Sequence, residues 1–240
     1  MSAKEQINVM VAVVTVSSFV ERQKSITEQL HGLSLGHATF IYAWDIDTLH
    51  CCPFSFCDSL NVAAKSCAAK HLEAMKLFSE SECTHLIVLE DDALFLGKKP
   101  EALWALVDKF VLLPEAKMLY LGGADAAAEG LPHPMFPDLF VLSPGTTTEA
   151  YIVDRTAANH RLSWARKNML DLPVDHFYQK FDDQFGIIQL RPRRAVFTQG
   201  SVTGFFPTTL DLSRSRHSRV FLQIRFRLRR CLVLAKEWLR

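Results

Sequence analysis

The sequence lacks any apolar run close to the roughly eighteen residues that a bilayer-spanning helix needs. Its first apolar run, 9–16, is short, follows Lys4 and Glu5, and has no small-residue cleavage site. We therefore expect a β-strand at that point and not a signal peptide. Internal repeats and low-complexity segments are also missing, so nothing in the sequence indicates a repeat architecture.

Paired cysteine motifs are missing as well. The chain has 6 cysteines, three of them close together at Cys51, Cys52 and Cys57, but no CxxC pair and no second cluster. Buried free thiols are therefore favoured over a structural zinc site. Because secretory features are absent, these thiols indicate a reducing compartment, and we expect a cytosolic protein.

A strong overall charge is the third absence, since the formal net charge is only +1. The balance is uneven, however. From Arg214 to the C-terminus, nine Lys and Arg residues accompany one acid, Glu237, which leaves 18 basic and 25 acidic residues in 1–213. The sequence thus divides into a mildly acidic body, 1–213, and a strongly basic tail, 214–240.

The tail carries apolar residues every three or four positions, with basic residues between them. This pattern predicts an amphipathic helix suited to an anionic membrane surface, where each Lys or Arg contributes about 1 kcal/mol. The alternative is a helix docked on the body with solvated arginines. Nucleic acid is not expected as a partner, because the body is acidic and no aromatic stacking platform is evident. The apolar stripe consists of Phe221, Ile224, Leu228, Cys231, Ala235 and Trp238.

Length and composition predict one large α/β domain with an appendage, since 240 residues with 49% hydrophobic and 22% charged content are ordinary globular values. The order strand, helix, strand in the first 45 residues is typical of a βαβ unit and a mostly parallel central sheet. Proline-rich residues 124–145 predict a long loop or a small hairpin. Strands are predicted at 7–16, 39–44, 86–89, 117–122, 146–153 and 193–197, and helices at 20–30, 61–79, 101–112, 156–167 and, briefly, after 172.

The most informative stretch is the strand at 86–89, which ends in Glu90, Asp91 and Asp92. Three adjacent carboxylates at the end of a buried strand repel one another and lose hydration, so they need a counter-charge. Oxygen ligands suit Mg²⁺ or Mn²⁺, which commonly bind carboxylates together with substrate phosphates. Because side chains alternate along an extended chain, Glu90 and Asp92 are expected to point the same way and Asp91 elsewhere. A solvated acidic turn is the alternative.

Polar residues follow two other predicted strands, Thr15 to Ser18 after the first and Asp45 after the second. Open α/β sheets bind ligands at the carboxyl ends of their strands. We therefore expect these segments and the acidic triplet to border one site.

Several stretches in order resemble bacterial glycosyltransferase family 25, of the lipopolysaccharide or lipooligosaccharide β-galactosyltransferase type. The resemblance covers most of residues 8–205, and the chain departs from the family's usual pattern at Ser17-Ser18-Phe19, Lys70 and Asp154. The matching stretches are Val20-Glu21-Arg22, Tyr42-Ala-Trp-Asp45, Ser66-Cys-Ala-Ala-Lys-His71-Leu, Ile87-Val-Leu-Glu-Asp-Asp92, Glu149-Ala-Tyr-Ile-Val153, Pro173-Val-Asp175 and Thr198-Gln199-Gly-Ser201.

The resemblance implies a GT-A-like nucleotide-binding fold, a UDP-sugar donor such as UDP-galactose, Mn²⁺ or Mg²⁺, and inversion at the anomeric carbon. It also implies a glycolipid or oligosaccharide acceptor, with the protein peripheral on the cytoplasmic face of the bacterial inner membrane. Two alternatives stay open. A nucleotidyltransferase would need a glycine-rich, basic loop after the first strand, whereas residues 15–20 contain no glycine. The other is a catalytically silent peripheral-membrane protein that binds sugar nucleotides.

The resemblance assigns roles to the carboxylates. Asp92, with Glu90, is expected to hold the metal, which offsets charge on the UDP leaving group, and Asp91 to bind the ribose or the donor sugar. An inverting transfer needs a general base, for which we favour Asp175 over Glu149. The alternative role of Asp175 is N-capping of the helix that follows.

Further polar residues are predicted to contact the donor. Arg22 could bind the diphosphate, although a surface helix arginine is the alternative. His71 falls on an apolar helix stripe, where a satisfied core histidine is common. Gln199 and Ser201 follow the last predicted strand and could equally be turn formers. The complete predicted donor set is Thr15, Arg22, Asp45, His71, Asp91, Gln199 and Ser201.

Overall fold

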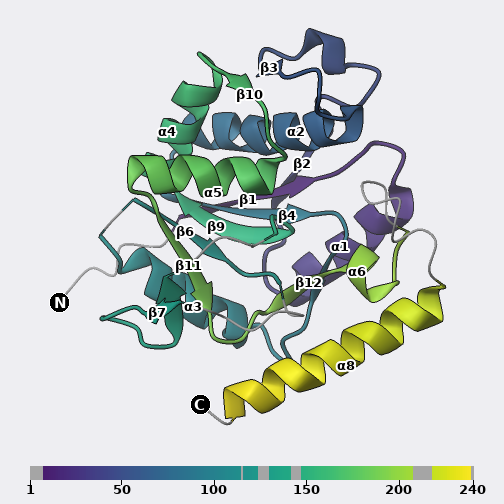
Figure 1. The fold of residues 1–240 in the computed structure, drawn as a ribbon, viewed down its shortest axis with the longest axis vertical. Helices are drawn as coiled ribbons and strands as arrows, with labels where there is room; N and C mark the ends of the chain where they lie inside the picture. Colours follow the sequence, from purple (N-terminus) through teal and green to yellow (C-terminus); the bar gives the residue numbers. More distant parts are fainter. Residues whose placement is uncertain (1–7, 115, 124–129, 142–146, 208–217, 239–240) are drawn as a thin grey trace.

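The computed structural model describes residues 8–114, 116–123, 130–141, 147–207 and 218–238. An 8-stranded sheet has the order β2-β1-β4-β9-β6-β11-β8-β7, in which β9 and β8 run opposite to the other strands. The predicted α/β class with a mixed, mostly parallel central sheet is confirmed (Figure 1). The strands are β1 (Val9–Val14), β2 (Ala38–Ile41), β4 (His85–Glu90), β6 (Lys117–Tyr120), β7 (Leu131–Pro132), β8 (Leu139–Val141), β9 (Ala150–Asp154) and β11 (Ile188–Pro192).

Helices cover both faces of this sheet, and α2, α4 and α5 lie together on one side in Figure 1. Side-chain alternation explains the two cores: on β1, Ala12 and Val14 pack into the cluster formed with α2, α4 and α5, whereas Val11 and Val13 pack into the cluster formed with α1 and α3. The helices are α1 (Val20–Gly32), α2 (Val62–Ser79), α3 (Glu101–Val111), α4 (Arg155–Ala165), α5 (Val174–Phe185), α6 (Gly200–Thr203) and α8 (Arg219–Trp238).

Two short strand pairs and a single 3₁₀ turn complete the described elements. β5 (Ala93–Phe95) follows the acidic triplet and pairs antiparallel with β12 (Phe197–Gln199), so that 197–199 lie beside the metal-candidate residues. β3 (Ser55–Phe56) pairs with β10 (Met169–Leu170), and the turn η1 spans Leu49–Cys51.

One strand prediction is wrong. A single last strand was expected at 193–197, but the chain forms β11 at Ile188–Pro192 and β12 at Phe197–Gln199. Polar residues interrupt the apolar pattern expected of β11 as a buried strand. They are tolerated there because their hydrogen bonds are made with other groups inside the fold. The Gln189 side chain donates to Asp182 over 2.8 Å, and the Arg191 guanidinium donates to the Gly123 carbonyl.

The remaining differences are of extent. The proline-rich segment contains the β7–β8 hairpin, while 124–129 and 142–146 lie outside the described residues. The helix expected briefly after 172 is α5, which runs for 12 residues and ends at Gly186 in the left-handed conformation. None of the described helices combines the length and apolarity needed to cross a bilayer.

The C-terminal helix α8 lies along the lower side of the domain in Figure 1, with α6 beside its first turns. Leu222 and Arg219 contact Gly204, the residue that ends α6. Among the α8 side chains that the structure describes, Leu222 is buried and Phe226, Arg230 and Val233 are half-buried. This face therefore points at the body, and residues 208–217, which include the start of the predicted tail, lie outside the described part.

Candidate functional site

The carboxyl ends of β1, β2 and β4 border a cavity of about 650 Å³ at one edge of the sheet. β1 and β4 are parallel neighbours, so the residues that follow them lie side by side. The structure brings together at this cavity the polar residues that the sequence places after the three strands. Its lining includes Thr15, Arg22, Asp45, Glu90 and Asp91.

Asp91 and Arg22 are engaged with each other. The Arg22 guanidinium lies 3.1 Å from Asp91 Oδ1, and the Thr15 hydroxyl donates to Oδ2 over 2.7 Å. Burial raises the pKa of Asp91, and the bonds from Thr15 and Arg22 offset part of that rise. Arg22 is held further by the Pro207 carbonyl and by the Phe19 ring, 4.6 Å from its guanidinium carbon. Arg22 and Asp91 thus neutralise each other's charge on one side of the cavity.

Asp45 is compensated by a different cation. It accepts hydrogen bonds from the Ser17 backbone N–H at 3.0 Å and from the Ser17 hydroxyl, and it pairs with the buried ammonium of Lys70. Burial acts to raise the pKa of Asp45, but Lys70 and Ser17 outweigh burial and lower it. Ser17 and Lys70 are positions where the chain departs from the family it resembles, and both meet at this one carboxylate.

Glu90 and Asp92 both face the segment that follows β12, as the strand alternation predicts. Glu90 accepts from the Thr148 hydroxyl at 3.0 Å and from the Gln199 amide at 3.3 Å. Asp92 Oδ2 accepts from the Ser201 backbone N–H at 3.1 Å. Burial and the charge of Glu90 raise the pKa of Asp92 to about 6. The two carboxylates therefore act on each other across a buried space.

The Glu90–Asp92 pair fits a divalent cation. Within the described residues, Asp92 Oδ1 is fully buried and has no hydrogen-bond partner. A buried carboxylate oxygen without a donor is costly unless a cation completes it. Because Mg²⁺ and Mn²⁺ take carboxylate oxygens, Glu90 and Asp92 are the residues that would hold such an ion.

His71 and Cys67, one turn apart on α2, stand next to Glu90. His71 is fully buried, its Nδ1 lies 3.0 Å from the Tyr151 hydroxyl, and its Nε2 lies 3.5 Å from Glu90 Oε1. Burial acts to raise the pKa of Glu90, but the bonding and charge of His71 lower it overall. Cys67 lines the cavity. His71 is thus both a core histidine, as one alternative held, and a neighbour of the site.

The two general-base candidates occupy different environments. Burial raises the pKa of Cys67 well above its usual value, and the charges of Glu90, Asp175 and Asp92 add to this rise. Asp175 is partly exposed and accepts from the His176 N–H at 2.9 Å in the first turn of α5. Glu149 is enclosed instead: it accepts from the Gly123 N–H at 2.6 Å and from Thr147.

The enclosure of Glu149 has an electrostatic consequence. Its carboxylate packs so closely on Gly122 that a Cβ at that position would collide with it. Burial raises the pKa of Glu149 to about 7, with hydrogen bonds from Thr147 and Gly123 opposing the rise. Glu149 lines neither of the two cavities described in this section.

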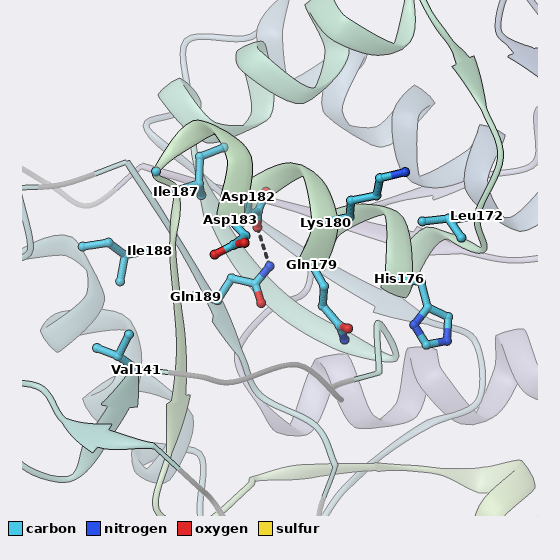
Figure 2. A pocket seen from close by; sticks show the side chains of 11 residues that line it. Val141, Leu172, His176, Gln179, Lys180, Asp182, Asp183, Ile187, Ile188 and Gln189 are labelled. Atoms are coloured by element: carbon cyan, nitrogen blue, oxygen red, sulfur yellow. Dashed lines mark hydrogen bonds between the residues drawn. The ribbon is translucent and has the colours of Figure 1, made fainter.

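A second cavity, of about 670 Å³, runs along α5 and the start of β11. Figure 2 shows His176, Gln179, Lys180 and Asp183 on α5 and Gln189 on β11 around this space, with the Gln189–Asp182 hydrogen bond drawn as a dashed line. Leu172 and His176, which line one end, flank Asp175 in sequence. The polar lining suits a hydroxyl-rich ligand.

Sequence reasoning missed two residues of the site, Lys70 and Cys67, whereas Ser17 lies in the predicted segment Thr15 to Ser18. Lys70 had a signal, because it departs from the family's usual residue one position before His71. Cys67 had only its spacing of four from His71, which places both on one face of a helix. The predicted residues Gln199 and Ser201 contact the metal-candidate carboxylates, but neither of them lines the cavity itself.

Comparison with known proteins gives distant structural likenesses. No model of a protein family matches the chain, and no curated protein matches it. A glycosyltransferase involved in glycosylation of the major capsid of PBCV-1 is 12% identical and covers 91% of this chain and 99% of its own, with a TM-score of 0.45. A Drosophila β-1,4-galactosyltransferase 7 mutant in complex with manganese, UDP-Gal and xylobiose is 12% identical and covers 88% and 81%, with a TM-score of 0.44.

A nucleotidyltransferase is also similar. The inositol-1-phosphate CTP transferase from T. maritima is 14% identical and covers 92% of this chain and 97% of its own, with a TM-score of 0.37. Likenesses at this level do not say which residues act in this chain. Family 25 therefore stays a resemblance of the sequence.

Proposed function

We propose that this protein is an inverting, metal-dependent glycosyltransferase that moves a hexose, galactose from UDP-galactose, to a lipooligosaccharide, lipopolysaccharide or other surface-glycan acceptor. The observation that carries the proposal is the buried Glu90–Asp92 pair, in which one carboxylate oxygen has no donor among the described residues. The adjoining cavity of about 650 Å³ falls in the range typical of small-molecule sites.

The residues that we assign to the nucleotide-sugar donor are held in place by contacts within the protein. A divalent cation, when bound, offsets charge that develops on the diphosphate leaving group. Glu90 and Asp92 hold that cation, while Ser201 and Gln199 fix the two carboxylates by hydrogen bonds. Asp45 offers a polar wall for the nucleoside, and its pairing with Lys70 keeps this wall from repelling an anionic ligand.

Asp175 is the residue we assign as general base toward the acceptor hydroxyl. It is partly exposed, and Leu172 and His176, close to it in sequence, line the cavity along α5. Glu149 is the less suitable candidate because Gly122, Gly123 and Thr147 enclose its carboxylate. The cavity along α5 begins beside Asp175, and this position supports its use as the acceptor groove.

The nucleotidyltransferase alternative is disfavoured by the loop after β1. Such enzymes use that loop to hold a triphosphate. In this chain the Ser17 N–H is bonded to Asp45 and the Thr15 hydroxyl to Asp91, so these donors are already used. A catalytically silent sugar-nucleotide-binding protein would keep the same contacts, and it is separated from an enzyme by whether UDP is released.

The test is a thermal-shift screen of UDP-hexoses with and without Mn²⁺, followed by an assay of UDP release. A ligand that binds only the folded chain stabilises it by about 2.7 kcal/mol at a hundred times its dissociation constant. We expect a Mn²⁺-dependent rise in Tm with UDP-galactose that Asp92→Asn abolishes and that Asp58→Asn, in an exposed surface pair, retains. No rise with any UDP-hexose would contradict the proposal, and a rise without UDP release would favour the silent protein.

The helix α8 is the part that we assign to an anionic membrane surface, on the cytoplasmic face of the inner membrane. Phe221, Ile224 and Leu228 of the predicted stripe are 49%, 54% and 63% exposed. They lie on the side of the helix away from Leu222, which contacts the body. Arg225 and Arg227 lie next to members of this exposed apolar stripe in sequence. Positive charge beside apolar side chains suits an anionic lipid surface.

Liposome flotation tests this assignment. Replacing Arg225 and Arg227 by alanine should weaken binding to anionic vesicles about thirtyfold, because each arginine contributes about 1 kcal/mol near the surface. Ile224→Ser with Leu228→Ser should weaken it as well. Neutral phosphatidylcholine vesicles serve as the control. Equal binding of wild type and both variants to anionic vesicles would rule out α8 as the membrane contact.

A further inference from the structure

Three side chains of different chemistry meet beside the proposed donor cavity: Cys67, His71 and Glu90. Cys67 and His71 are four residues apart on α2 and therefore lie on one face of the helix. Glu90 is the last residue of β4, which packs against this helix. One thiol, imidazole and carboxylate atom from the three lie within 4.8 Å of one another.

His71 supplies the observation that points to a ligand. The Tyr151 hydroxyl satisfies its Nδ1 at 3.0 Å and also fixes the orientation of the ring. Its Nε2 is fully buried and, among the described residues, makes no hydrogen bond, although Glu90 Oε1 is 3.5 Å away. A buried ring nitrogen whose nearest polar contact is this long approach to Glu90 is destabilising unless something else binds it. Cys67 is the third member of the group around Glu90 and His71.

The chemistry of the three possible ligand atoms favours one class of metal ion. Thiolate and imidazole ligands suit zinc, whereas Mg²⁺ and Mn²⁺ prefer oxygen. Zinc bonds of about 2.0–2.3 Å in a tetrahedron place ligand atoms roughly 3.5 Å apart. A group within 4.8 Å reaches that spacing through a small rotation of the partly buried Cys67 side chain. Three protein ligands leave a fourth position, and Cys67 lines the cavity from which water or a ligand can fill it.

We propose that Cys67, His71 and Glu90 form a zinc site that shares Glu90 with the nucleotide-sugar cation, so that zinc and the donor complex exclude each other. Zinc binding breaks the Cys67 S–H bond, forms a zinc–sulfur bond and releases the proton to solvent. The zinc site does not depend on the proposed transferase activity. The exclusion rests on it, because it requires a donor cation on Glu90.

This site differs from the one that the cysteine pattern would suggest. Cys51 and Cys57 belong to the clustered cysteines of the sequence, yet among the described residues the group of three or more possible His, Cys, Asp and Glu ligands is Cys67, His71 and Glu90. Glu90 reaches the group from a distant part of the chain. The sequence spacing therefore does not show it.

Cobalt titration of the full chain tests the zinc site directly. Co²⁺ bound by a thiolate gives a charge-transfer absorption band in the near ultraviolet, and tetrahedral Co²⁺ gives visible bands. We expect both in the wild type, saturating at one ion per chain and displaced by Zn²⁺. Cys67→Ser should lose the charge-transfer band, and Cys231→Ser, at an exposed cysteine on α8, should keep it. Absence of the band in the wild type, or its persistence in Cys67→Ser, would overturn the site.

The exclusion is measured separately, as the Tm rise given by UDP-galactose and Mn²⁺. One equivalent of Zn²⁺ should remove that rise in the wild type, whereas in Cys67→Ser it should leave unchanged the rise that this variant gives without zinc, whatever its size. Zinc that leaves the wild-type rise unchanged would overturn the exclusion. If the cobalt band is present and no UDP-hexose raises the Tm, the transferase proposal fails while the zinc site stands.

Discussion

The protein buries carboxylates in two regions and compensates them in opposite ways. Between α4 and α5, Asp182 is 0% exposed and accepts two bonds from Arg161, one of them 2.8 Å long, and a third from Gln189. At the end of β4, Asp92 is 3% exposed and lies beside a second carboxylate, Glu90. Both oxygens of Asp182 accept hydrogen bonds from protein donors, whereas Asp92 Oδ1 has no donor among the described residues.

This difference separates a structural use of buried charge from a binding use. The Arg161 guanidinium lies 4.0 Å from the Tyr178 ring centroid, so the pair is also built into the aromatic core. Such a pair contributes order to the fold, although its net stabilisation over an apolar pair is small. In the pair Glu90 and Asp92, the raised pKa of Asp92 marks its charged form as destabilising in the free protein, which is typical of a carboxylate at a binding site.

The largest effect is expected from breaking the compensated region. Asp182→Ala leaves the buried Arg161 charge without its carboxylate, and it should lower the free energy of unfolding by about 3–5 kcal/mol. Urea denaturation followed by circular dichroism measures this. The exposed neighbour Asp183→Ala is the control and should change little. Asp182→Leu together with Arg161→Met should recover most of the loss, and a double variant as unstable as Asp182→Ala would contradict the explanation.

The opposite result is expected at the end of β4. Asp92→Asn should reduce the rate of UDP release about 10²–10³-fold, the size typical of losing one group that stabilises transition-state charge. It should not lower the Tm of the metal-free protein at pH 7.5. Because the folded pKa of Asp92 is raised to about 6, its favourable contribution is present below its ordinary pKa and is lost as the pH rises through 6.

The same experiment can break the comparison. If the metal-free Asp92→Asn protein were as destabilised as Asp182→Ala, then Asp92 would be a structural carboxylate and the two regions would not differ.

A smaller effect is expected at the other end of β4, where burial keeps a histidine neutral. Burial, with the charge of Lys117, lowers the pKa of His85 to about 4 from its ordinary 6.5. The contribution of His85 to the free energy of unfolding is present above pH 6.5 and is lost as the pH falls toward 4. At 1.36 kcal/mol per pKa unit, the loss is at most about 3 kcal/mol.

His85→Asn keeps a polar atom near the Thr84 hydroxyl and removes the titration. We expect the urea midpoint of this variant to fall less than that of the wild type between pH 6.5 and 4.5. The exposed His50→Asn is the control and should follow the wild type. Identical pH profiles for His85→Asn and the wild type would contradict the assignment.

The regular elements were largely predictable because their sequence patterns are local. The βαβ opening, the long helix α2 and the strand before the acidic triplet follow from apolar spacing alone, and the structure confirms them. β11 was not predictable in this way. Its polar side chains bond inside the fold, Gln189 to Asp182 on the preceding helix and Arg191 to the distant Gly123, so they look like surface residues until the fold places their partners.

The candidate site was predictable only in part, for a related reason. Strand alternation predicted the separate bonding partners of Asp91, but not that Glu90 and Asp91 both line the cavity, because the chain turns at 91–92. The Lys70–Asp45 pair depends on how α2 packs across the end of β2, which no local pattern encodes. The approach of Cys67 to Glu90 depends on the same packing.

The attachment of α8 has a mechanical consequence. The helix meets the body at Gly204, which ends the four-residue helix α6, and α6 starts at Gly200, whose N–H binds the Asp92 backbone carbonyl at 2.7 Å. We therefore expect a displacement of the 20-residue helix α8 to be passed through the short helix α6 to the backbone of Asp92. Binding of α8 to another surface is in this way coupled to the position of the Asp92 carboxylate.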